Sequence, residues 1–92
     1  MAEWTGDDER QFQKLLGLVR GEMYRATKDH GAFNSAHEGY AVILEELDEL
    51  WLEVMKKRNL RSDDKLRAEA IQVAAMAIRF AMDLCPVSGE GE

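Results

Sequence analysis

The sequence predicts an all-α fold, a helical bundle of three main helices per chain that oligomerisation completes. Three stretches carry apolar residues at three- and four-residue steps, which is the period of an α-helix with one buried face. Each stretch follows residues typical of a helix start, and no strand signal or internal repeat lies between them. The 92 residues therefore make one domain, 1–92, with residues 1–6 and 86–92 expected as flexible ends.

The composition is that of a globular protein of the cytosol. Of the residues, 46 % are hydrophobic and 33 % are charged, and no apolar run approaches the ~20 residues of a membrane span. The N-terminus lacks the basic and apolar regions of a signal peptide, so we expect a cytoplasmic location. Cys85 is the single cysteine, which excludes an internal disulfide. The net charge of -6 argues against binding a nucleic acid polymer, but not against binding one nucleotide through a metal.

The first helix is expected over residues 9–27. Asp7 and Asp8 precede it, and carboxylates stabilise the positive end of a helix dipole. Gly17 and Gly21 lie opposite its apolar stripe and each costs roughly 1 kcal/mol relative to Ala, so this helix depends on packing. The stripe consists of Phe12, Leu15, Leu16, Val19, Met23 and Ala26.

The second helix is expected from Ser35 to about Lys57, after a turn at residues 29–34. Ser35 and Glu38 have the spacing of a capping box, in which each side chain accepts a hydrogen bond from the other residue's backbone N–H. We place Trp51 in the core with the rest of the apolar stripe, and stacking on a nucleotide base is the alternative for its ring. The stripe consists of Tyr40, Ile43, Leu44, Leu47, Leu50, Trp51 and Val54.

The third helix is expected over residues 63–84, with Ser62 at its start and Pro86 just beyond its end. From Glu69 to Leu84 it is apolar almost all round, and such a helix is buried on most sides. Two amphipathic neighbours from one small chain cannot easily wrap it. We therefore infer a homo-oligomer, most simply a dimer, and a compact three-helix monomer is the alternative.

The second helix also has an acidic face, which consists of Glu45, Glu46, Glu49 and Glu53. No Lys or Arg occurs between Ala36 and Met55, although like charges one turn apart repel by a few tenths of a kcal/mol. Glu46 and Glu49 can point at one ion, and Glu69 offers a third carboxylate from the third helix. Carboxylate ligands suit Mg²⁺ or Mn²⁺ better than zinc, and such a metal supports the attack of water on a phosphoryl group.

These residues also carry a family resemblance. Residues 45–49, EELDE, resemble the EExxE motif of the MazG-like all-α nucleoside triphosphate pyrophosphohydrolases. A second motif of that family, ExxD, follows about 20 residues later on the next long helix, and residues 69–72, EAIQ, occupy its place. The resemblance extends over roughly residues 35–84, more than half of the chain.

The resemblance implies a Mg²⁺-dependent enzyme that cleaves a (d)NTP between its α- and β-phosphates. The products would be (d)NMP and pyrophosphate, formed by metal-activated water without a covalent intermediate. It makes Glu46, Glu49 and Glu69 the catalytic metal ligands, with Glu45 and Gln72 completing the metal-binding set. It also implies a homodimer or homotetramer, in agreement with the inference from the third helix.

Gln72 departs from the family pattern, because it stands where the family has an aspartate. A neutral amide binds Mg²⁺ more weakly than a carboxylate and cannot act as a base. Three outcomes stay open. Glu53 or Asp83 compensates for the missing carboxylate, the activity is reduced, or the domain binds nucleotides without cleaving them.

Lys65 and Arg79 flank Glu69 on one line of the third helix and are candidate phosphate-binding residues. The alternative for both is a salt bridge across the helices to Glu49 or Glu53. His37 and Phe33, near the start of the second helix, are candidates for contacting the nucleotide base or sugar. The other interpretation of His37 is a surface histidine.

Three functions follow from these patterns. We predict a nucleoside triphosphate pyrophosphohydrolase. A non-catalytic module that binds or sequesters nucleotides on the same bundle is the second candidate. An acidic helical interaction protein, whose acidic face meets a basic partner, is the third.

Overall fold

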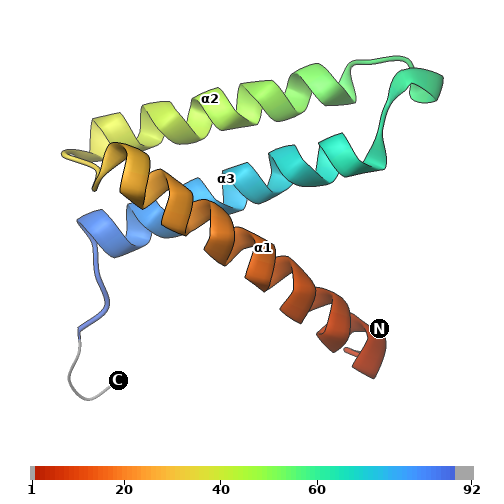
Figure 1. Ribbon diagram of the computed structural model, residues 1–92, viewed down its shortest axis with the longest axis horizontal. Coiled ribbons are helices and arrows are strands. Elements are labelled where there is room, and N and C mark those ends of the chain that lie inside the picture. Colours follow the sequence, from red (N-terminus) through yellow and green to blue (C-terminus); the bar gives the residue numbers. More distant parts are fainter. Residues whose placement is uncertain (1, 89–92) are drawn as a thin grey trace.

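A computed structural model of the chain describes residues 2–88. It contains α1 (Gly6–His30), α2 (Ala36–Val54), a short 3₁₀ helix η1 (Arg58–Leu60) and α3 (Asp63–Leu84), and this described part has no strand. Helices α2 and α3 form an antiparallel hairpin, and α1 crosses α3 and then diverges from the hairpin toward its own N-terminus (Figure 1). The prediction of an all-α fold is confirmed. Of the ends predicted to be flexible, residue 1 and residues 89–92 lie outside the described residues.

Helix α1 is longer than predicted, by three residues at each end. Thr5 caps it: the Thr5 Oγ1 accepts a hydrogen bond from the Asp8 N–H at 3.1 Å, and the Asp8 Oδ2 accepts one from the Thr5 N–H at 2.9 Å. This is a reciprocal capping box with aspartate in the place of the usual glutamate. The predicted start lay after Asp7 and Asp8, whereas the capping residue is Thr5, so that Asp7 and Asp8 belong to the first turn of the helix.

The other two helices begin where the sequence predicts. The Ser35 Oγ accepts a hydrogen bond from the Glu38 N–H, but the Glu38 carboxylate accepts from the N–H of Asn34 rather than from that of Ser35. Only half of the predicted capping box therefore forms. The Ser62 Oγ caps α3, whose bounds agree with the prediction. Helix α2 ends at Val54, three residues before the predicted end at Lys57.

The core is small and is centred on α3, which packs against both other helices, whereas α1 and α2 do not pack against each other. Among residues 2–88 no large side chain is fully buried. The buried hydrophobic residues are Val19, Phe33, Ile71, Ala75 and Met76. A single chain therefore buries little apolar surface for its length.

The apolar stripe of α2 is divided between two environments. Ile43 packs against the core together with Val42, which lies outside the stripe, and Leu50 is half-buried. Trp51, however, is 58 % exposed, so its predicted place in the core is wrong for the single chain. The reason is that α2 packs on α3 alone, which leaves most of the stripe without a partner. The exposed part of the stripe consists of Tyr40, Leu44, Leu47, Trp51 and Val54.

Within the described range, no helix is long and apolar enough to cross a membrane.

Helices α2 and α3 approach closely at Gly39, and this contact gives the first prediction. A Cβ at Gly39 would lie 2.6 Å from a ring carbon of Phe80 and 3.2 Å from a methyl carbon of Leu84. Overpacking costs about 1–3 kcal/mol, against about 1 kcal/mol gained from helix propensity. We expect Gly39→Ala to lower the free energy of unfolding, measured by urea titration, by about 1 kcal/mol.

Gly17→Ala is the matched control, because a Cβ at Gly17 meets nothing within 4 Å. This substitution should raise the free energy of unfolding by up to about 1 kcal/mol. Equal stabilisation by the two substitutions would show that α2 and α3 are not closely packed at Gly39.

Candidate metal centre

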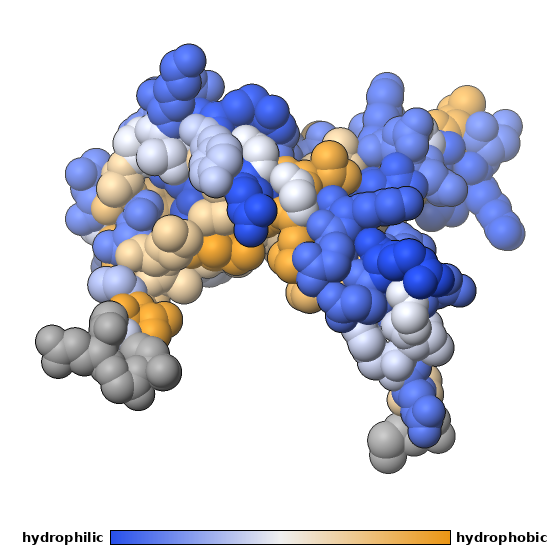
Figure 2. All heavy atoms as spheres, turned by 60° about the horizontal axis from the view of Figure 1, so that its bottom comes forward, coloured by the Kyte–Doolittle hydropathy of each residue, from blue (hydrophilic) through white to orange (hydrophobic). Residues whose placement is uncertain are grey.

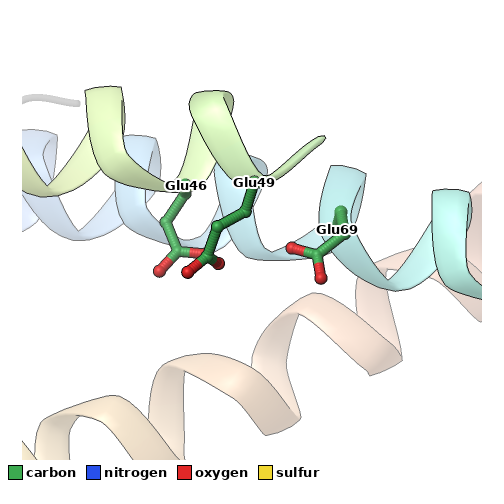
Figure 3. Close-up of side chains that lie close together, drawn as sticks. All are labelled: Glu46, Glu49 and Glu69. Carbon is green, nitrogen blue, oxygen red and sulfur yellow. The ribbon is translucent and has the colours of Figure 1, made fainter. Parts of the chain in front are cut away.

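Three carboxylates from two helices meet on one side of the hairpin. Glu46 and Glu49 lie one turn apart on α2, and Glu69 lies on α3. One carboxylate oxygen from each lies within 4.8 Å of the other two. The three side chains point to the side of the hairpin on which α1 crosses (Figure 3). The structure thus brings together the three residues that the sequence proposed as metal ligands, which we call the glutamate triad.

The triad is electrostatically unfavourable on its own. Burial, followed by the negative charges of Glu49 and Glu69, raises the pKa of Glu46 from its ordinary value of 4.5 to about 7. A hydrogen bond with Glu49 and the charge of Glu45 act in the same direction. Because α2 carries no Lys or Arg, no cation of this helix offsets the repulsion. Near neutral pH the Glu46 carboxyl is therefore more readily protonated than an ordinary glutamate, and a cation at this point would relieve the same repulsion.

Glu69 gives a second indication of a missing partner. Its Oε2 atom is buried, and no residue in the described part of the chain donates a hydrogen bond to it. A buried carboxylate oxygen without a donor is costly, so such atoms usually bind a cation, a donor or water. Oxygen-only ligands of this kind fit Mg²⁺ or Mn²⁺.

Glu22 of α1 is the residue that sequence reasoning missed. The Gln72 Nε2 donates a hydrogen bond to the Glu22 Oε2 at 2.5 Å. Glu22 also pairs with Arg25, whose hydrogen bond is the main cause of a lowered pKa at Glu22. The available signal was position: Glu22 follows the buried Val19 by three residues, so it lies near the core-facing stripe of α1.

The two carboxylates that were proposed to compensate for Gln72 have other partners. Glu53 accepts hydrogen bonds from the Lys56 Nζ at 2.9 and 3.0 Å. Asp83 accepts a hydrogen bond from the Phe33 N–H at 3.0 Å. Glu22 is instead the carboxylate that contacts Gln72.

A cavity of about 530 Å³ lies beside the triad, which is within the size range of small-molecule sites. Glu45 and Glu46 line it from α2, Gln72 from α3 and Glu22 from α1. Phe33, Val42 and Met76 form its apolar part. The cavity therefore combines an acidic end next to the triad with an apolar wall.

Arg79 is a buried residue in the lining of this cavity. Its side chain is only 4 % exposed, and its Nη2 donates a hydrogen bond to the backbone oxygen of Gly31. Its guanidinium lies 4.5 Å from the centre of the Phe33 ring and 4.0 Å from the Asp83 carboxylate. The salt bridge suggested between Arg79 and Glu49 or Glu53 does not form. Arg79 instead holds the link between α1 and α2 against α3.

The remaining predicted substrate residues lie apart from the cavity. Lys65 is exposed on the first turn of α3, and its backbone N–H contacts the capping Ser62. His37 is exposed on the first turn of α2. Neither lines the cavity, whereas Phe33 and Arg79 do.

Comparison of the chain with protein-family models, with curated proteins and with solved structures found no match.

The raised pKa of Glu46 predicts a pH-dependent stability. Between pH 4.5 and about 7 the unfolded chain loses the Glu46 proton and the folded chain keeps it, so the folded state binds more protons. The free energy of unfolding should therefore fall as the pH rises through this window. Urea titrations in EDTA at pH 5, 6, 7 and 8 measure this slope, which Glu46→Gln should flatten.

Asp48→Asn is the control for this experiment, because Asp48 is an exposed carboxylate of the same helix outside the triad. It should leave the slope unchanged. A Glu46→Gln protein with the slope of the wild type would contradict the description of the triad.

Proposed function

We propose that this chain is a Mg²⁺-dependent nucleotide pyrophosphohydrolase that converts a (d)NTP to a (d)NMP and pyrophosphate. The observation that carries the proposal is the convergence of Glu46, Glu49 and Glu69 within 4.8 Å. The buried and unpartnered Oε2 of Glu69 supports a cation among them. The resemblance of residues 45–49 and 69–72 to the two motifs of the MazG-like family directs the proposal to this reaction.

The triad would hold the metal, which in such a site polarises phosphoryl oxygens and lowers the pKa of bound water. Glu22 would supply the carboxylate that Gln72 does not. The hydrogen bond from Gln72 fixes the Glu22 side chain in the cavity, and the lowered pKa keeps it ionised. In this interpretation the amide of Gln72 orients the carboxylate of Glu22 and does not itself take the place of the family's aspartate.

The cavity beside the triad gives the nucleotide a place. Its acidic end adjoins Glu46, so phosphates would reach it only together with a cation. Phe33, Val42 and Met76 offer an apolar wall to the base. The Arg79 guanidinium packs over the Phe33 ring, so we assign Arg79 a positioning role in place of phosphate binding. A homodimer or homotetramer in the cytoplasm remains part of the proposal.

Gln72 favours a second candidate, a domain that binds nucleotides without cleaving them. Its side chain cannot take a proton from water, and its amide donates to Glu22. If Glu22 serves only to hold Gln72, the cavity keeps its shape and its cation but lacks a base. The two candidates differ in product formation, not in binding.

The proposal predicts Mg²⁺-dependent release of pyrophosphate from at least one (d)NTP. Glu49→Gln should reduce turnover at least about 100-fold, because it removes a direct metal ligand from a set of three. Glu49 is exposed, so the variant should fold. A coupled pyrophosphate assay over the (d)NTPs measures the effect, and Asp48→Asn, which changes an exposed acid of the same helix, should keep full turnover.

Calorimetry on the same proteins separates the candidates. Nucleotide binding in Mg²⁺ without pyrophosphate would favour the binding module. Absence of both binding and product would reject the two nucleotide functions together.

A further inference from the structure

The single chain exposes far more surface than a folded monomer of its mass. Its accessible surface is 7351 Å², whereas a monomer of 10.5 kDa is expected to expose about 5400 Å². Its radius of gyration is 15.4 Å, against about 12 Å for a compact domain of this length. The excess of roughly 1900 Å² per chain matches what an obligate dimer buries.

Part of this surface is the exposed part of the α2 stripe, which we call the α2 seam. Tyr40, Leu44, Leu47, Trp51 and Val54 follow one another at steps of four, three, four and three residues. This is the spacing with which one helix packs along another. Leu47 and Trp51 at its centre are 48 % and 58 % exposed. Burial of these exposed side chains requires an apolar groove on another surface.

A groove of about 610 Å³ lies between α1 and α3. Figure 2 shows hydrophobic surface gathered on this face of the molecule, in the hollow between the two ends of the chain. Met82, at 60 % exposure, is the most exposed large hydrophobic residue of α3. Arg20 and Lys28 belong to the lining of the groove. The apolar lining residues are Leu16, Val19, Met23, Tyr24, Ile78 and Met82.

The distribution of charge favours contact of the α2 seam with the groove over contact of one seam with another. All charged residues of α2 from residue 38 to residue 54 are Asp or Glu. Pairing of two α2 helices would therefore bring like charges together. The groove between α1 and α3 presents Arg20 and Lys28 beside its apolar lining. An acidic helix with an apolar seam is complementary to this groove.

We propose that the α2 seam of a second copy of this chain occupies the groove between α1 and α3, and that the exchange is reciprocal. Two equivalent contacts then close a twofold dimer, in which each chain gives its seam and receives its partner's seam. Both exposed apolar surfaces are covered by one kind of contact. This inference specifies the homo-oligomer that is part of the proposed function, and its test measures association alone, so that its failure is distinguishable from a failure of the enzymatic proposal.

Light scattering after size exclusion, at about 50 μM protein, tests the interface. The wild type should have the mass of two chains. Leu47→Asp in the seam and Met82→Asp in the groove should each raise the dissociation constant at least about tenfold, because each buries a carboxylate in every contact. Both residues are exposed in the single chain, so circular dichroism should show intact helices.

A mixture of the two variants is the decisive arm. In the mixed dimer, the unaltered seam of one chain meets the unaltered groove of the other, so one of the two contacts is intact. Equimolar Leu47→Asp and Met82→Asp should therefore dimerise more tightly than either variant does alone. A monomeric wild type, a Met82→Asp variant that dimerises as tightly as the wild type, or a mixture that dimerises no more tightly than the separate variants would each overturn the proposal.

Discussion

Repulsion among the glutamate triad is the constraint on which the account of this protein depends. Glu46, Glu49 and Glu69 are held together because α2 and α3 pack closely along their length, with Gly39 allowing the approach near one end. The fold therefore creates a concentration of negative charge that it does not neutralise. Burial of the Glu46 carboxyl, together with this charge, raises its pKa to about 7. A protein that keeps such a cost usually gains a ligand from it.

The contacts of Arg79 show how other parts of the chain position the residues around the glutamate triad. Arg79 contacts the backbone of Gly31, the ring of Phe33 and the carboxylate of Asp83, and so fixes the link from α1 to α2 on α3. Glu22 of α1 lies next to Gln72 and lines the cavity beside the triad. These contacts of Arg79 are structural, and they determine the shape of the candidate site.

Local patterns carried most of what the sequence could predict. The helices, the caps at Ser35 and Ser62 and the convergence of the triad depend on residue spacing within one helix or on two neighbouring helices. Trp51 was misplaced because spacing does not say whether a partner for an apolar face belongs to the same chain. Glu22 was missed because its contact joins residues 50 positions apart, and such pairing follows from how α1 crosses α3.

Binding of Mn²⁺ tests the central claim most directly, because electron paramagnetic resonance detects the free ion and so counts the bound one. The account predicts that the wild type binds one ion per chain at neutral pH and that Glu69→Gln, which alters the buried and unpartnered carboxylate, loses it. If the wild type leaves Mn²⁺ free, or if Glu69→Gln binds it as tightly, the three carboxylates do not share a metal ion.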